Sequence, residues 1–463
     1  MRIGFGNVRL AAFLAIACFA PGKALAAEAT KEPAAPIALD LCGTPTQIGE
    51  RWGTANRQAI HRALEQYLAK AKQEKLSEET LIRRAQPFVE IVNRVAPHWI
   101  VEARAIAAAA DLDANLYLSF LANWPRGIGF HECTSYAVSR QFTRDNAVFF
   151  HKNRDNVDCE QAAYVLASSA PGVNKFLAVT NASAVNCSMM VNDKGLAGSA
   201  DYPARLTRKD DPNALLPEPA EPQFRGVMND FLLRHLAERA ADCSQALNII
   251  RDFSDKGYYA GGTVNGTHWL FVDRAGTVME VSSNSGHVVH KIHTQKVYFS
   301  RLDGSPAATR LCQATEPVDF HLFHSVSRDP SICLRSSISG MTVEIDPQHP
   351  EVLSCAWIAL PAKSLALPVF MGARRTPVCL VSGELYNTGK SLNSEKSQWE
   401  ALERRTYAEK QQLAGKIQGL LTTGRTAEAV ELLDKWTEDT AQTQLAILKQ
   451  LAPPAAQPSA TRP

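Results

Sequence analysis

The spacing of the apolar residues changes near residue 133, and this change constrains the fold more than any other feature. From 58 to 121 apolar residues recur at helical spacing, as at Ile60, Leu64 and Leu68. From 133 to 150 short apolar runs bounded by turn residues predict two strands joined near 143–146. Helices that give way to paired strands predict a layered α+β domain.

The same alternation of helices and strands continues to the end of the chain. Strands are expected at 176–179, 188–191, 268–272, 278–281, 287–299, 337–345 and 352–358, and helices at 228–253, 397–421 and 426–436. Residues 27–40 are expected to be a loose leader and 211–223 a proline-rich surface loop. The chain divides into a targeting segment (1–26), a helical N-terminal segment (27–132), a core (133–386) and a helical C-terminal extension with a low-complexity tail (387–463).

The N-terminus has the pattern of a secretory signal peptide. Arg2 and Arg9 form a basic region, residues 10–20 are apolar, and Ala24-Leu25-Ala26 matches a cleavage site. The apolar run is shorter than the roughly 20 residues that span a membrane, so no membrane span is expected. We expect an exported protein, periplasmic or secreted. Cys18 leaves a lipoprotein as the alternative.

The charge balance argues against a nucleic-acid partner. The formal net charge is +2, from 49 Lys and Arg against 47 Asp and Glu. Removal of Arg2, Arg9 and Lys23 with the targeting segment brings it to 2 − 3 = −1. Such a chain has no strong field of one sign to attract nucleic acid or an anionic membrane.

The cysteine count is odd once the targeting segment is removed. Ten cysteines become nine without Cys18, and an exported protein normally pairs its thiols. Either one thiol is left free by design, with Cys133 as the candidate, or several are buried and free. Two bonds are predicted, Cys312–Cys333 and Cys355–Cys379.

Cys133 and a polar group at 152–155 occupy the two ends of the predicted hairpin. Cys133 opens the first strand, and Lys152, Arg154 and Asp155 end the returning one. A hairpin would bring them together, and nearby cations lower the pKa of a thiol and make it a nucleophile. On spacing alone, the alternative is a buried cysteine beside a polar hairpin corner.

Five short motifs in one order resemble a known family. They are Val101–Ala107, Cys133–Val138 with Asn153-Arg154-Asp155, Val191–Ala197, Asp201-Tyr202-Pro203, and Val272–Gly276 with Met279–Val281. Together they resemble the N-terminal-nucleophile cysteine amidohydrolases, which include isopenicillin-N acyltransferase-like proteins, choloylglycine hydrolases and acid-ceramidase-like enzymes. The resemblance covers roughly residues 95–385.

The resemblance implies a fold and a reaction. The fold is an αββα sandwich with a helical N-terminal pro-segment and a helical C-terminal extension. A precursor cuts itself between Glu132 and Cys133, and its two chains stay together as a heterodimer. The freed α-amine, with a pKa near 7.7–8.0, takes the thiol proton. Cys133 then cleaves a linear amide of a small molecule through an acyl-enzyme, and water or another amine accepts the acyl group.

The resemblance also assigns roles to individual residues. Asp155 would orient the α-amine, although an Asx turn explains the same residue. Lys152 stands where choloylglycine hydrolases have an arginine beside the thiol, and whether it or Arg154 faces the sulfur is open. Asn192, Asp201 and Tyr202 fall in the motifs that bind substrate.

The chain departs from the family where the oxyanion hole is expected. Ser300-Arg301 stand in place of the usual asparagine, so Asn284, Arg301 or backbone N–H groups must stabilise the oxyanion. Arg310 is the candidate for a supporting arginine, or else part of a surface ion pair. The departure favours a second function, a non-catalytic periplasmic binding or scaffold protein with the same fold.

No cofactor and no metal are expected. His287, His290 and His293 are the most suggestive group of possible ligands. Residues three apart on a strand point to opposite faces, so these three imidazoles do not converge on one ion.

Overall fold

The computed structural model describes residues 37–122, 133–156, 159–201, 226–260, 266–391 and 396–451. All of them belong to one compact unit, residues 34–463. Several expectations lie outside the described residues. These are the signal peptide with Cys18, Glu132 of the cleavage site, Tyr202, the proline-rich loop 211–223 and the tail after 451.

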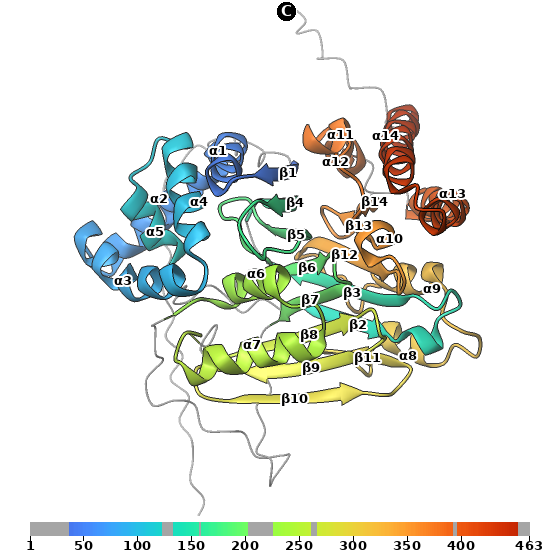
Figure 1. Ribbon diagram of the computed structural model, residues 1–463, viewed down its shortest axis with the longest axis horizontal. Helices are drawn as coiled ribbons and strands as arrows, with labels where there is room; N and C mark the ends of the chain where they lie inside the picture. Colours follow the sequence, from blue (N-terminus) through green and yellow to red (C-terminus); the bar gives the residue numbers. More distant parts are fainter. Residues whose placement is uncertain are drawn as a thin grey trace, which may run out of the picture. The chain divides into compact units, whose positions relative to one another are not determined.

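Two sheets form the centre of this unit (Figure 1). The eight-stranded sheet has the order β1 (Ile37–Gly43), β4 (Gln161–Ser168), β5 (Phe176–Asn181), β6 (Met189–Asn192), β7 (Leu196–Asp201), β8 (Thr267–Asp273), β9 (Val278–Ser283), β10 (Val288–His293). The six-stranded sheet has the order β11 (Val297–Phe299), β2 (Thr134–Val138), β3 (Val148–Asp155), β12 (Ser337–Ile345), β13 (Cys355–Ala359), β14 (Leu367–Phe370). Neighbouring strands are antiparallel except β1 and β4, which are parallel.

An apolar layer joins the two sheets face to face. Phe150 and Val343 from the six-stranded sheet pack with Leu177, Val191 and Leu270 from the eight-stranded sheet, and all are buried. Alternate residues of the same strands, such as Phe149, face the other way and pack against helices. Both faces of each sheet are therefore covered, as the near-continuous apolar runs require.

Helices cover the outer face of the eight-stranded sheet. They are α1 (Pro45–Ala55), α2 (Arg57–Gln73), α3 (Glu78–Val95), α4 (Pro97–Ala109), α5 (Ala114–Leu121), α6 (Asn229–Arg239) and α7 (Cys243–Asp255). A Cβ atom at Gly49 or Gly53 would lie 2.4 Å from the Glu102 carbonyl oxygen or 2.6 Å from that of Ile106. Only glycine permits such close packing of α1 on α4.

A second helical layer covers the outer face of the six-stranded sheet. It contains α8 (Pro306–Cys312), α9 (Phe320–Val326), α13 (Lys396–Thr422) and α14 (Thr426–Leu451), and the short helices α10 (Pro350–Leu353), α11 (Val378–Val381) and α12 (Glu384–Ser391) lie nearby in the chain. Tyr407, Ile417 and Leu433 bury their side chains with Phe320 and Trp357. The order helix, sheet, sheet, helix confirms the expected αββα sandwich.

The C-terminal helices are bound to the sheet by buried ion pairs as well as apolar contacts. Lys410 on α13 contacts Glu344 on β12 at 2.5 Å, and Glu403 holds the buried Arg328. Breaking a buried pair by removing one partner typically costs about 3–5 kcal/mol. The segment expected as an extension therefore completes the fourth layer of the sandwich.

Three expectations about elements are wrong. Residues 37–40, expected in a loose leader, begin strand β1, which pairs with β4. The single strand expected at 287–299 is two strands in different sheets, because the chain crosses from β10 to β11. Strand β4 itself was not expected, and α14 continues to Leu451 rather than ending near 436.

The predicted disulfides are also wrong. Cys312, Cys333, Cys355 and Cys379 are all free thiols. Cys312 is exposed on α8, Cys355 and Cys379 are buried in two different apolar clusters, and Cys333 is buried outside those clusters. Burial rather than pairing accounts for these thiols, because cysteine packs as a small apolar residue.

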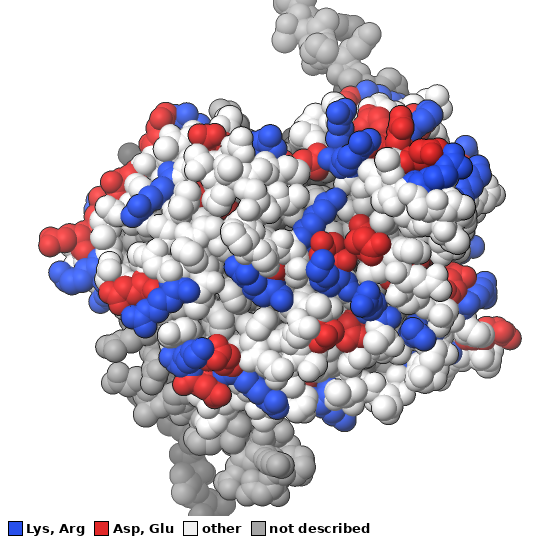
Figure 2. All heavy atoms as spheres, in the orientation of Figure 1, with Lys and Arg blue, Asp and Glu red and all other residues white. Residues whose placement is uncertain are grey.

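Basic and acidic side chains are interspersed over the surface. On the face shown in Figure 2 the blue and red atoms mix, and neither sign dominates. Within the described part of the chain, no helix has the length and apolar character needed to cross a membrane.

Candidate active site

The inner face of the six-stranded sheet changes from apolar to polar toward the start of β2. Ala137 and Phe150 point into the apolar layer between the sheets. Two residues farther along the same face, Ser135 and Lys152 lie opposite each other. Side chains two residues apart in extended chain point to the same face, so Cys133, two residues before Ser135, also lies on this face. Cys133 is buried, with 6% of its surface exposed.

Lys152 crosses from the six-stranded to the eight-stranded sheet. Its Nζ donates to the carbonyl oxygens of Ser188 (2.9 Å) and Ala200 (2.6 Å) and lies 3.1 Å from Asp201 Oδ1. The side chains of Lys152 and Asp201 are each 1% exposed. Neither carboxylate oxygen of Asp201 has a hydrogen-bond partner. The pair is therefore held by charge and proximity, and Asp201 keeps its capacity to accept hydrogen bonds.

Arg154 is occupied by neutral groups of the opposite sheet. Its Nη1 donates to Gln161 Oε1 (2.9 Å) on β4 and to Asn181 Oδ1 (2.8 Å) on β5. Lys152 affects the pKa of the Cys133 thiol more strongly than Arg154 does. Of the two cations that the sequence left open, Lys152 is thus the principal electrostatic partner of the thiol.

Asp155 is fixed at the end of β3 by a partner on β12. The Ser337 hydroxyl donates to Asp155 Oδ1, and Ser337 is the register partner of Asp155. A β-bulge between Ser337 and Ser339 shifts the register here. Bulges re-aim side chains at strand ends, and this one positions Asp155 close enough to influence the thiol of Cys133.

Burial raises the pKa of the Cys133 thiol above its ordinary value. Lys152 and Arg154 lower this pKa, and Asp201 and Asp155 raise it. The sequence had suggested a thiol pKa lowered by its cations, and that direction is wrong. The cations are balanced by carboxylates that the second sheet and the strand end bring in. At neutral pH the thiol is protonated and needs a base before it can attack.

Ser300, which the resemblance placed at the expected oxyanion hole, bonds to the first inner strand. Its backbone N–H donates to the Ser135 carbonyl (2.8 Å), and its Oγ accepts the Ser135 N–H (2.9 Å). Ser135 Oγ in turn contacts Ser199 Oγ (2.9 Å) on the other sheet. Ser300 thus extends the pairing of β11 with β2 toward Cys133, and the half-buried Arg301 follows it. The Ser300 hydroxyl can accept this bond and still donate its own hydrogen.

Three predicted site residues have polar atoms that are engaged in local hydrogen bonds. Asn192 is the last residue of β6, and its side chain accepts the N–H of Leu196 at the start of β7. Leu196 is five residues, or about 17 Å, along β7 from Asp201. The carboxamide of Asn192 is used by the Ala237 and Ala240 carbonyls and by backbone N–H groups of its own turn.

The other two residues serve local structure as well. Asn284 Oδ1 accepts the N–H groups of Gly286 and His287 and so closes the turn after β9. Arg310 is exposed on α8, in the outer layer, and donates to Ser325 Oγ (3.0 Å).

Asp230 belongs to the site region although no motif pointed to it. It lies in the first turn of α6. Burial raises the pKa of its carboxyl group, and Arg154 and Lys152 lower it. A helix from the outer layer thus contributes a third carboxylate near these cations, which spacing along the chain does not reveal.

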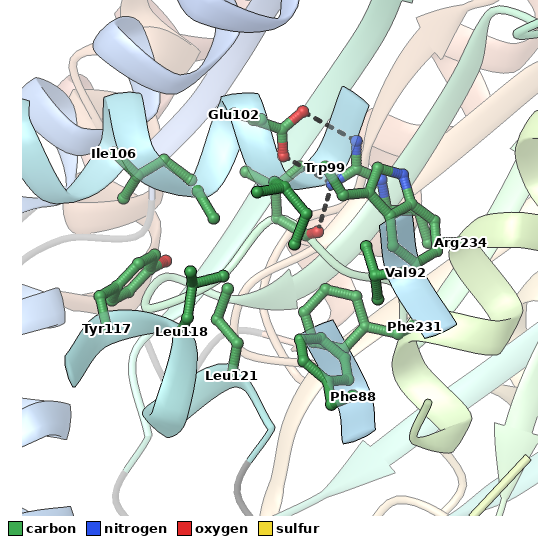
Figure 3. Close-up of a pocket in the computed structure, with 13 residues that line it drawn as sticks. Phe88, Val92, Trp99, Glu102, Ile106, Tyr117, Leu118, Leu121, Phe231 and Arg234 are labelled. Atoms are coloured by element: carbon green, nitrogen blue, oxygen red, sulfur yellow. Dashed lines mark hydrogen bonds and ion pairs between the residues drawn. The ribbon is translucent and has the colours of Figure 1, made fainter. Parts of the chain in front are cut away.

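The helical layer contains a narrow, mainly apolar hollow, lined by residues of helices α3 to α6 (Figure 3). Phe88, Leu121 and Phe231 line it, and the Glu102–Arg234 ion pair closes one side. Each of these two charges has hydrogen-bond partners, so this pair is structural. No three His, Cys, Asp or Glu side chains in the described ranges are placed to hold a metal ion.

Three solved structures are among those similar to this chain, all at low sequence identity. One is penicillin V acylase from Agrobacterium tumefaciens, 14% identical, with a TM-score of 0.35 over 52% of this chain and 86% of that chain. Another is a Caenorhabditis elegans ortholog of N-acylethanolamine-hydrolyzing acid amidase, 12% identical, with a TM-score of 0.33 over 47% and 94%. A variant of conjugated bile acid hydrolase from Clostridium perfringens is 11% identical, with a TM-score of 0.33 over 52% and 92%.

Sequence comparison adds no further relative. No family model matches the chain, and no curated protein matches it. The functional argument therefore rests on the side chains around Cys133 and on the motifs that contain them.

Proposed function

We propose that this chain is an exported cysteine amidohydrolase or acyltransferase that cleaves a linear C–N amide bond of a small molecule through an acyl-enzyme on Cys133. One observation carries the proposal. A buried thiol with a raised pKa lies immediately before an inner strand, beside Lys152, Asp155 and Asp201. Such a thiol needs a base, and a cut before Cys133 would supply one on the same residue.

The first chemical step follows from this arrangement. The precursor cuts itself between Glu132 and Cys133, which frees an α-amine with a pKa near 7.7–8.0. This amine takes the thiol proton as the sulfur attacks the amide carbonyl. Asp155, held by Ser337, accepts a hydrogen bond from the resulting ammonium and fixes its direction. The C–N bond then breaks, and the leaving amine takes the proton back from the ammonium.

The second step releases the acyl group. Water, or a second amine, attacks the thioester carbonyl while the α-amine accepts its proton. The C–S bond breaks and the thiol of Cys133 is restored. We assign stabilisation of the oxyanion to the Ser300 hydroxyl and Arg301, because Ser300 bonds Ser135, which is two residues after Cys133. Removing one such donor typically lowers the rate about 100- to 1,000-fold.

The two halves of the cut precursor would remain one molecule. Strand β1, from the upstream half, pairs with β4 from the downstream half. Arg234 on α6 donates to both carboxylate oxygens of Glu102 on α4. Separation of the two fragments would break these buried contacts, so we expect the fragments to stay associated after the cut.

A non-catalytic binding or scaffold protein is the second candidate. The observation that favours it is Ser300, because its oxygen is used to accept the Ser135 N–H where the family has an asparagine. Under this candidate the chain stays intact and Cys133 is one more buried thiol.

Turnover of an N-acyl amide panel separates the two candidates. We expect hydrolysis by the wild-type protein and by Cys312→Ser, which removes an exposed thiol. Cys133→Ala should release no product. Mass spectrometry after a brief reaction should find the acyl group on Cys133. Equal turnover by Cys133→Ala would refute the proposal, and an intact, inactive wild-type chain would favour the scaffold.

A further inference from the structure

Three neighbouring strands place a row of polar side chains on the inner face of the eight-stranded sheet. Asp201 on β7 is the register partner of His268 on β8, and His268 is the register partner of Ser282 on β9. Directly opposite residues of antiparallel strands share a face and lie about 5 Å apart at Cβ. All three are at most 3% exposed, and Asp201 contacts Lys152. We name Asp201, His268 and Ser282 the acceptor row.

Every member of the acceptor row has a buried polar atom without a hydrogen-bond partner, although Asp201 Oδ1 also lies in an ion pair with Lys152. These atoms are both carboxylate oxygens of Asp201, Nδ1 of His268 and Oγ of Ser282. A buried polar atom left without a hydrogen bond costs about 1–3 kcal/mol, and native proteins contain few of them. Three adjacent residues with this defect, next to the candidate nucleophile, indicate a place that a ligand completes.

Glu280 determines which ring nitrogen of His268 donates a hydrogen bond and which one can accept. Its Oε1 lies 3.1 Å from His268 Nε2 and its Oε2 lies 3.0 Å from His293 Nε2. Burial raises the pKa of Glu280, but the hydrogen bonds that it accepts from the two imidazoles lower it well below its usual range. The ionised carboxylate accepts a hydrogen from each Nε2. Each Nδ1 is then left as an acceptor, and His293 Nδ1 is also without a partner.

The charges around the row favour a cationic donor. Asp201 and Glu280 contribute two negative charges against the one positive charge of Lys152. The unpartnered atoms of Asp201 and His268 can only accept hydrogen bonds, and Ser282 can do either. A group that carries several N–H donors and a positive charge, an alkylammonium, meets all of these conditions.

We propose that the acceptor row is a subsite for an ammonium group carried by the substrate. Its place in turnover rests on the amidohydrolase function proposed above, whereas binding of an ammonium does not. The substrate class would then be amides whose acyl or amine part bears a free amino group, within reach of Cys133.

Binding can be measured with probes that are not substrates. We expect isothermal titration to show n-butylammonium binding to the full-length protein and n-butyrate, of the same length and opposite charge, not binding. Ser282→Ala should weaken n-butylammonium about fivefold to tenfold, the loss expected for one hydrogen bond, and His268→Phe by at least as much. Equal binding of the two probes, or an unchanged affinity in Ser282→Ala, would overturn the proposal.

Ser283→Ala is the matched control. Ser283 is buried beside Ser282 on the opposite face of β9, and its Oγ already accepts the Trp269 N–H at 2.8 Å. This variant should lower stability and leave n-butylammonium affinity unchanged. Ser282→Ala should lower n-butylammonium affinity and leave stability nearly unchanged, because it removes an oxygen that has no hydrogen-bond partner. A loss of affinity in both variants would mean that general unfolding, and not the acceptor row, controls binding.

Two pairs of linear amides connect the row to turnover. In each pair one amide ends in an ammonium and the other in a methyl group, on the amine side in one pair and on the acyl side in the other. We expect the ammonium to raise kcat/KM about 100-fold or more in one pair, and Ser282→Ala to reduce that ratio. Cleavage without regard to the ammonium would reject the row and keep the amidohydrolase. Inert amides with intact n-butylammonium binding would reject the amidohydrolase and support the row.

Discussion

Arg234 and Lys152 are two buried cations on opposite sides of the eight-stranded sheet, and their surroundings differ. The Arg234 guanidinium donates to both oxygens of Glu102 (2.6 and 2.8 Å), to Glu238 (2.9 Å) and to the Val185 carbonyl. The ammonium of Lys152 has two carbonyl acceptors and the charge of Asp201.

The carboxylates around these cations complete the contrast. Glu238 also accepts hydrogen bonds from His98 and from Trp99, both at 2.9 Å. Asp201 accepts none, and its neighbours His268 and Ser282 are equally incomplete. Full satisfaction marks a cluster that holds the fold together. Incomplete satisfaction, beside a buried thiol, marks a cluster that is arranged for a ligand.

The largest expected effect is on the satisfied cluster. Arg234→Met leaves Glu102 and Glu238 buried without their cation and should lower the free energy of unfolding by about 3–5 kcal/mol. Urea unfolding followed by circular dichroism measures it. Arg239→Met, on the same helix but only partly buried and bonded to two backbone carbonyls, is the control and should change stability by about 1 kcal/mol or less. A loss below about 1 kcal/mol for Arg234→Met would break the contrast.

A matched pair of carboxylate variants sharpens the contrast between stability and activity. Glu238→Gln should cost about 3 kcal/mol, because it weakens a fully bonded buried ion pair. Asp201→Asn should cost less than Glu238→Gln, because it breaks no hydrogen bond of the carboxylate and Lys152 keeps its two carbonyl acceptors, although the ammonium loses its buried counter-charge. Asp201→Asn should instead lower kcat/KM about tenfold to hundredfold, whereas Glu238→Gln should affect turnover only as far as it unfolds the protein. The reverse pattern would contradict our assignment of the two clusters.

Acid should unfold the protein through its satisfied carboxylates. Burial alone raises the pKa of Glu238 and Glu403, but Arg234 and Arg328 respectively, with neighbouring histidines, lower each pKa to about 2. Because the folded pKa lies below the ordinary value of 4.5, these groups stabilise the fold above pH 4.5. That stability is lost as the pH falls from about 4.5 toward 2. Urea midpoints that stay constant over this range would exclude the effect, and Glu403→Gln should flatten the curve.

The smallest expected effect concerns the thiols. Cys312 is exposed and Cys133 is buried, so iodoacetamide should label Cys312 first in the native protein. Cys312→Ser should remove this label and leave stability within about 0.5 kcal/mol of the wild type. Peptide mass spectrometry after a time course measures both. Rapid labelling of Cys133 ahead of Cys312 would show that the thiol is more accessible and more ionised than its surroundings indicate.

The sequence predicted elements whose partners are close in the chain. The hairpin from Cys133 to Asp155 and the helix pair α6–α7 have clear periodicity and lie where expected. Strand β1 was missed, because it pairs in parallel with β4, which is more than 100 residues downstream, and follows an Ala- and Pro-rich segment. Such pairing is decided by the tertiary fold rather than by local pattern.

The site was predictable to the same extent. Register within one hairpin brings Lys152 and Asp155 toward Cys133, and the spacing showed this. Glu280 and His268 reach the site because two sheets pack face to face, which no spacing along the chain encodes. The direction of the thiol pKa was missed for the same reason, since it depends on burial and on Asp201 from the second sheet.

Intact mass and N-terminal sequencing of the purified protein test the central claim most directly. We predict two chains, the larger one starting at Cys133, and a single uncut chain for Cys133→Ala expressed in the same way. Self-cleavage by the thiol explains both results, because one side chain attacks the Glu132–Cys133 carbonyl. A Cys133→Ala protein that is still divided after residue 132 would show that another protease makes the cut, and it would contradict the proposed mechanism.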